Sequence, residues 1–157
     1  METDILRWLH AVGAAVLLGT GAGIAFFMMM AYRTGDVRLI AGVARIVVIA
    51  DFVFTATAVV LQPATGILLA ISTGWSLGEG WIQLSLLLFV VTGAFWLPVV
   101  WIQIILRRIA EQAIADGTPL PETYHRLYRI WFAFGFPAFT AVLAIFWLML
   151  TRPAIAW

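Results

Sequence analysis

The sequence predicts an all-α membrane protein built as a bundle of four transmembrane helices. The first observation is that four long stretches carry no charge: 25 residues between Arg7 and Arg33, 27 between Asp51 and Glu79, 27 between Glu79 and Arg107, and 22 between Arg129 and Arg152. About 20 apolar residues are enough to cross a bilayer core as a helix. The second is the composition, which is 64% hydrophobic and 11% charged. A soluble domain of this size could not bury so much apolar surface.

The third observation is the position of the arginines, which also predicts the topology. Seven of the nine basic residues fall in the first and third connections, namely Arg33, Arg38, Arg45, Arg107, Arg108, Arg126 and Arg129. The connection over residues 72–80 has no basic residue. Because cytoplasmic loops are enriched in arginine and lysine, we expect both termini in the periplasm and a multi-pass location in the bacterial inner (cytoplasmic) membrane. Residues 1–157 are then a single four-helix domain.

The spans can be placed in order along the chain. The first covers about residues 8–32 and carries small residues at every fourth position, Ala11, Ala15, Gly19 and Gly23. Such a stripe lets a neighbouring helix approach closely. The second and third spans, about 44–71 and 81–107, contain Pro63 and Pro98, and each proline removes a helix hydrogen bond and favours a kink. The fourth span covers about residues 129–151.

Composition excludes several classes of function. The chain has no cysteine, which excludes disulfides, thiolate metal sites, iron–sulfur clusters and covalently attached c-type haem. The net charge is +1 and no basic tract is present, so nucleic acid is not an expected partner. The lipid bilayer is the expected surrounding, with a homo-oligomer or a larger membrane complex as the further partners to consider. No catalytic residues are indicated.

Polar residues within the spans repeat at helical spacing. The second span carries Asp51, Thr55, Gln62 and Thr65 on one face, and the third carries Ser85, Thr92, Trp96 and Gln103 on one face. Because intramembrane polar groups face the bundle interior, we expect Asp51, Gln62, Trp96 and Gln103 to turn inward. Asp51 has two interpretations: an ion pair with Arg129 that ties the second and fourth spans together, or a proton-relay or cation site.

His10 is the only histidine within a span. A neutral imidazole inside a helix bundle is the usual axial ligand of b-type haem, and Met149 on the fourth span lies at a similar depth and could supply the other side. The sequence thus offers His10 as a metal ligand and His10 with Met149 as haem-binding residues. The alternative is that His10 only hydrogen-bonds Gln83 or the backbone near the membrane interface.

Several segments resemble a known family of bacterial integral-membrane proteins. They are residues 7–10 (RWLH), 18–28 (LGTGAGIAFFM), 50–51 with 62–66 (AD and QPATG), 96–103 (WLPVVWIQ), and 129–132 with 137–139 (RIWF and PAF). This set resembles the family designated domain of unknown function 2269. The resemblance implies a four-helix inner-membrane protein and supplies no activity.

A wider group is more distantly similar. The Leu9-His10 start of a small-residue-rich first span is similar to the copper-resistance D proteins and to the membrane protoporphyrinogen oxidase. That similarity implies haem b bound through the first-helix histidine. The oxidase group also relies on an intramembrane lysine, and all nine basic residues here are arginine, so the oxidase reaction itself is not implied.

Three functions therefore remain open from the sequence. The first is a small haem-b protein for electron transfer or redox chemistry. The second is an oligomeric transport or proton-conducting protein that uses the polar stripe around Asp51. The third is a structural or accessory subunit of a membrane complex without a cofactor.

Overall fold

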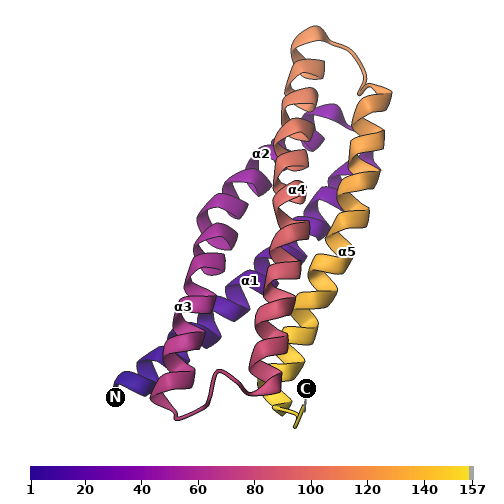
Figure 1. The fold of residues 1–157 in the computed structure, drawn as a ribbon. Helices are drawn as coiled ribbons and strands as arrows, with labels where there is room; N and C mark the ends of the chain where they lie inside the picture. The colour runs from indigo at the N-terminus through magenta and orange to yellow at the C-terminus, as the bar shows by residue number, and fades with distance from the viewer. Residues whose placement is uncertain (156–157) are drawn as a thin grey trace.

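A computed structural model describes residues 1–155, and the described chain is helical with short connections (Figure 1). The elements are α1 (Glu2–Thr34), α2 (Val37–Ala50), the π-helical turn η1 (Asp51–Thr55), α3 (Ala56–Ser72), α4 (Gly80–Asp116) and α5 (Glu122–Thr151). No strand occurs in residues 1–155. Because α2, η1 and α3 run on as one rod, four rods are long and apolar enough to cross a membrane. The predicted all-α, four-span architecture is confirmed.

Local residues explain where the rods begin and end. The Asp36 side chain caps α2 by accepting hydrogen bonds from the backbone N–H groups of Arg38 and Leu39. Gly35 ends α1 at φ 69° and Gly117 ends α4 at φ 64°, a left-handed conformation that glycine adopts without steric cost. Both turns lie at the end of the bundle that carries most of the arginines, which we call the arginine end. The opposite end, where the chain starts, is the terminal end.

The main irregularity of the second rod lies at η1 rather than at its proline. Helices α3, α4 and α5 continue through Pro63, Pro98 and Pro137 without a break. At η1 the backbone N–H of Ala56 instead donates to the carbonyl oxygen of Asp51, five residues back. Such π-helical turns are frequent at functional sites. The turn gives Asp51 a local geometry that the helical spacing in the sequence did not predict.

The rods form two pairs that meet at the arginine end. Helix α1 packs along η1 and α3, and α4 packs along α5, whereas α2 contacts both α1 and α4. A core of buried side chains joins the pairs there; it includes Met28, Ala44, Leu106, Ala110 and Tyr128. Toward the terminal end the α1–α3 pair diverges from the α4–α5 pair, and α3 is not among the helices that pack closely on α4 or α5 (Figure 1). The divergence leaves an internal space.

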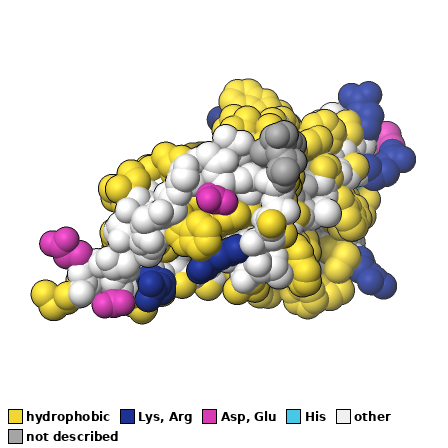
Figure 2. Space-filling view, turned by 60° about the horizontal axis from the view of Figure 1, so that its bottom comes forward, with side chains coloured by type: hydrophobic (Ala, Val, Ile, Leu, Met, Phe, Trp, Pro, Cys, Tyr) yellow, Lys and Arg dark blue, Asp and Glu magenta, His cyan; other side chains and the backbone are white. Residues whose placement is uncertain are grey.

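The outer surface of the rods suits lipid. Large apolar side chains are exposed along all four, among them Phe52, Leu97, Trp101 and Trp147. Figure 2 shows hydrophobic side chains over much of one face, with charged groups at the two ends of the view and also near its middle. Gly19 of the predicted small-residue stripe is exposed, with nothing within 4 Å of the position a Cβ would take. At Gly19 the stripe therefore does not pack against another helix of this bundle, and the close α1–α3 contact lies on another face.

Candidate ligand-binding cavity

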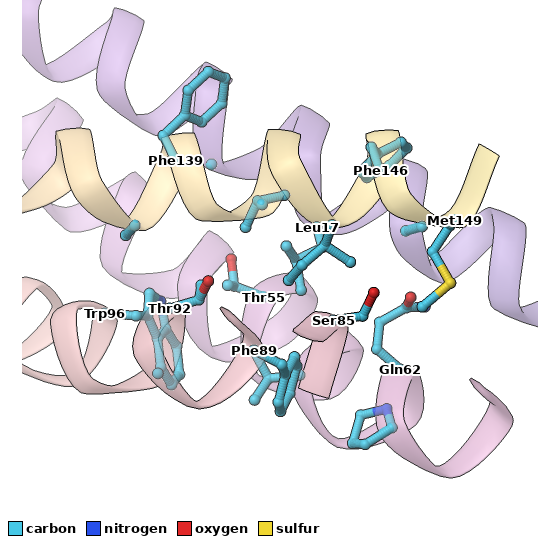
Figure 3. A pocket seen from close by; sticks show the side chains of 18 of the residues that line it. Leu17, Thr55, Gln62, Ser85, Phe89, Thr92, Trp96, Phe139, Phe146 and Met149 are labelled. Atoms are coloured by element: carbon cyan, nitrogen blue, oxygen red, sulfur yellow. The ribbon is translucent and has the colours of Figure 1, made fainter. Parts of the chain in front are cut away.

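A cavity of about 980 Å³ lies between the two helix pairs. It runs from Arg7, Trp75 and Arg152 at the terminal end to Asp51 and Gln103 deep in the bundle, and its wall is mostly apolar. Figure 3 shows this space, with Gln62 and Met149 toward one end and Thr55, Thr92 and Trp96 toward the other. Its size is at the upper limit of ordinary small-molecule and cofactor sites.

His10 lines the cavity, and its ring is held by Thr65 on the facing helix α3. The His10 Nδ1 atom is 3.0 Å from Thr65 Oγ1, which is itself 2.7 Å from the carbonyl oxygen of Leu61. Because the hydroxyl proton goes to that carbonyl, the hydroxyl accepts from Nδ1–H. We therefore assign the ring proton to Nδ1, which leaves Nε2 with a free lone pair and no hydrogen-bond partner in residues 1–155. Of the two alternative partners, Gln83 is exposed and makes no hydrogen bond to His10 in residues 1–155, whereas the backbone of Gln62 does lie beside the ring.

Two glycines bring α1 and α3 close enough for this contact. A Cβ on Gly66 would come within 3.0 Å of His10 Cε1, and a Cβ on Gly13 would collide with the Gln62 amide. Gln62 Nε2 donates to the His10 carbonyl oxygen at 3.0 Å, so this interior polar residue crosses from α3 to α1. The predicted stripes pointed to Gln62, and Gly13 could be expected only to leave room beside His10, room that the Gln62 amide occupies; Gly66 was not predicted. A glycine four positions after a polar residue, on the same helix face, was the signal in the sequence that could have indicated this close contact.

Met149 belongs to the opposite wall. It lies on α5, lines the same cavity as His10, and packs beside the buried cluster of Ala70, Trp81, Ile82 and Leu148. Figure 3 shows its thioether directed toward the part of the cavity where Gln62 lies. The structure therefore brings the two predicted haem-binding residues, one from each helix pair, to one space.

Asp51 lies at the deep end of the cavity, with 3% of its surface exposed. Trp96 Nε1 donates to its carboxylate at 3.4 Å, which is the hydrogen bond that Asp51 accepts from another side chain in residues 1–155, and Thr55 and Gln103 are its other polar neighbours. Thr55 Oγ1 and Gln103 Oε1 are both buried without a hydrogen-bond partner. Gln103 is 1% exposed. Polar atoms rarely stay unpaired in a protein interior, so this group is unusual.

The predicted ion pair between Asp51 and Arg129 is wrong. The Arg129 side chain is exposed and its Nη2 atom is 3.3 Å from Glu122 Oε1. The arginine keeps its charged head at the end of the bundle, near polar surroundings, instead of entering the apolar interior. The neutral N–H of Trp96 takes its place at the carboxylate, and no salt bridge to Asp51 occurs in residues 1–155.

Comparison with known proteins adds a family but no activity. No curated protein and no solved structure matches the chain. Residues 4–153 match the family described as "Predicted integral membrane protein (DUF2269)", which is the family that the sequence segments resembled. This match extends over all four rods, and the chain therefore belongs to that family of integral membrane proteins.

Proposed function

We propose that this protein binds haem b in the cavity between its helix pairs, with His10 as an axial ligand, and acts in membrane electron transfer or redox chemistry. The observation that carries the proposal is the arrangement of the imidazole. The contact with Thr65 favours the proton on Nδ1, which leaves the Nε2 lone pair without a partner in residues 1–155. Histidines that bind metals commonly donate their second ring N–H in this way.

Other residues around the cavity are also suited to binding haem. The mostly apolar wall suits a flat macrocycle, and Met149 offers a thioether on the opposite wall for the second axial position. Arg7 and Arg152 line the terminal end, where their guanidinium groups could pair with the two propionate carboxylates. Within residues 1–155, Arg152 has no carboxylate partner and instead lies over the Trp75 ring, 5.6 Å from its centroid.

Each residue has a distinct task in this proposal. When bound, the haem iron supplies one-electron chemistry. Thr65 orients the His10 ring, Gln62 fixes the α1 backbone beneath it, and the apolar wall excludes water. The arginines at the far end of the bundle support an orientation in which the cavity opens toward the periplasm of a bacterial inner membrane.

The experiment is an absorption spectrum of detergent-purified protein from haem-replete cells. We expect a Soret band in the wild-type protein, and we expect His10→Ala to lose it while keeping its helical circular dichroism. His125→Ala is the matched control, because His125 bonds the Tyr32 hydroxyl at the arginine end, at 2.8 Å, and does not line the cavity. A colourless wild-type preparation, or a band that disappears only with His125→Ala, would overturn the proposal.

Thr65→Val tests the hydrogen bond that orients the imidazole. We expect the variant to bind haem about 10–100-fold more weakly than wild type, as is typical for loss of an outer-shell partner of a metal ligand. Thr57→Val is the control, since Thr57 is on the same helix, exposed, and bonded only to its own helix at Val53 O. Haem titration of the apo-proteins measures both affinities. Equal affinities for the two variants would contradict a role for Thr65.

A further inference from the structure

We infer that the deep end of the cavity is a second site, which binds a primary ammonium group carried by an apolar ligand. Its residues are Asp51, Thr55 and Gln103, all of which line the cavity. The site lies away from His10: Thr65, which contacts His10, follows Asp51 by 14 positions on the same rod, or about 20 Å at the helical rise. The inference is independent of haem binding.

The charge of the site is the first argument. Asp51 is the one carboxylate residue among the described residues of the cavity wall, and no cation pairs with it there. The nearest arginine in sequence, Arg45, is exposed, and Arg129 pairs with Glu122. An ionised carboxylate inside a membrane protein is costly unless a positive charge compensates it. The site is therefore complementary to one positive charge.

The hydrogen-bonding atoms are the second argument, because they specify which cation fits. Thr55 Oγ1 and Gln103 Oε1 are buried oxygen atoms without partners, and both residues neighbour the Asp51 carboxylate. Together the three residues present three acceptors. A primary ammonium group has three N–H donors and no acceptor, so it would satisfy all three. A quaternary ammonium has no N–H and would leave the two lone oxygens unpaired.

The rest of the cavity indicates the body of the ligand. Beyond these polar groups the wall is largely apolar and rich in aromatic rings, including Phe89, Trp96, Trp131, Phe132 and Phe139. Figure 3 shows Thr55, Thr92 and Trp96 toward one end of the space, with Phe89 and Leu17 nearer its middle. Aromatic faces attract cations, and apolar walls favour a hydrocarbon body. Hard metal ions of the calcium type take six or more oxygen ligands, which this wall does not offer.

The experiment compares two ligands of the same shape on wild-type protein in lipid nanodiscs. The probes are 1-adamantylamine, whose apolar cage carries a primary ammonium, and 1-adamantanol, which carries a hydroxyl instead. Tryptophan fluorescence follows the titration, since Trp96 and Trp131 line the cavity. We expect the amine to bind about tenfold more tightly than the alcohol or better. Equal affinities would overturn the inference, as would stabilisation by sodium ions without any binding of the amine.

Variants then locate the site. Asp51→Asn keeps the size of the side chain. It should lower the affinity for the amine about tenfold or more and leave the affinity for the alcohol unchanged. Asp116→Asn removes an exposed carboxylate whose contact is Gln112, and should leave both affinities unchanged. His10→Ala should also retain amine binding, which separates this site from the haem proposal. The inference would be overturned if His10→Ala no longer bound the amine, or if Asp51→Asn bound it as tightly as wild type. The wild-type comparison decides the matter if Asp51→Asn does not fold.

Discussion

Leu106→Ala is expected to lower the free energy of unfolding by about 2 kcal/mol, the low end of the cost of large-to-small core substitutions. Leu106 on α4 is 0% exposed and packs in the core that joins the two helix pairs at the arginine end. In a bilayer the apolar transfer contribution is small, so the loss is mainly one of van der Waals packing. Because α2 reaches α4 through this core, the cavity walls should separate further as the core loosens.

Titration with sodium dodecyl sulfate in mixed micelles, followed by tryptophan fluorescence, measures the effect. Leu97→Ala is the matched control, because Leu97 is on the same helix but 63% exposed on the lipid-facing surface. Its removal should change the unfolding free energy by less than about 0.5 kcal/mol. If both variants lose the same stability, the buried core is not what holds the helix pairs together.

Gly13→Leu is expected to destabilise the α1–α3 contact by about 2 kcal/mol, within the usual cost of overpacking. A Cβ at this position would collide with the Gln62 amide, so the side chain can fit only if the amide moves. The Gln62 hydrogen bond to the His10 carbonyl oxygen would break, and the His10 ring would lose its position opposite Thr65. The variant should therefore lose both stability and haem retention.

Gly19→Leu provides the comparison, because it makes the same change on the same helix where nothing lies within 4 Å. We expect the unfolding free energy to stay the same or to rise slightly, since leucine favours helix more than glycine does. The same detergent titration and a visible spectrum report both variants. Equal behaviour of the two leucine variants would show that the close α1–α3 approach is not needed for the site.

The polar side chains show how far sequence could go toward the site. Spacing placed Asp51, Gln62, Trp96 and Gln103 on inward faces, and all four line the cavity. What spacing could not supply was the partner of each group. Asp51 and Arg129 were matched by charge, yet rotation about α5 turns the arginine toward Glu122. Partners depend on how helices are rotated against one another, and a single sequence carries no record of that rotation.

His10 and Met149, the residues proposed to bind haem, show the same difference between what sequence and structure reveal. The position of His10 in the first span was enough to propose a ligand, but its tautomer depends on Thr65, 55 residues away. A depth for Met149 similar to that of His10 could be predicted from sequence, whereas the cavity that both residues line depends on the divergence of the helix pairs. Neither the π-helical turn at η1 nor the glycine contacts at Gly13 and Gly66 was predicted, since each depends on close packing between helices.

The sequence by itself determined the membrane class, the four spans and the inward faces, because the bilayer demands long uncharged helices and penalises polar groups that face lipid. Only the tertiary structure decided that the helices separate into two pairs, that a large space opens between them, and which atoms meet across it. The physical reason is that lipid tails are as apolar as leucine, so helix association in a membrane is decided by detailed packing and a few hydrogen bonds. Those depend on side-chain fit between distant segments, which composition and periodicity do not encode.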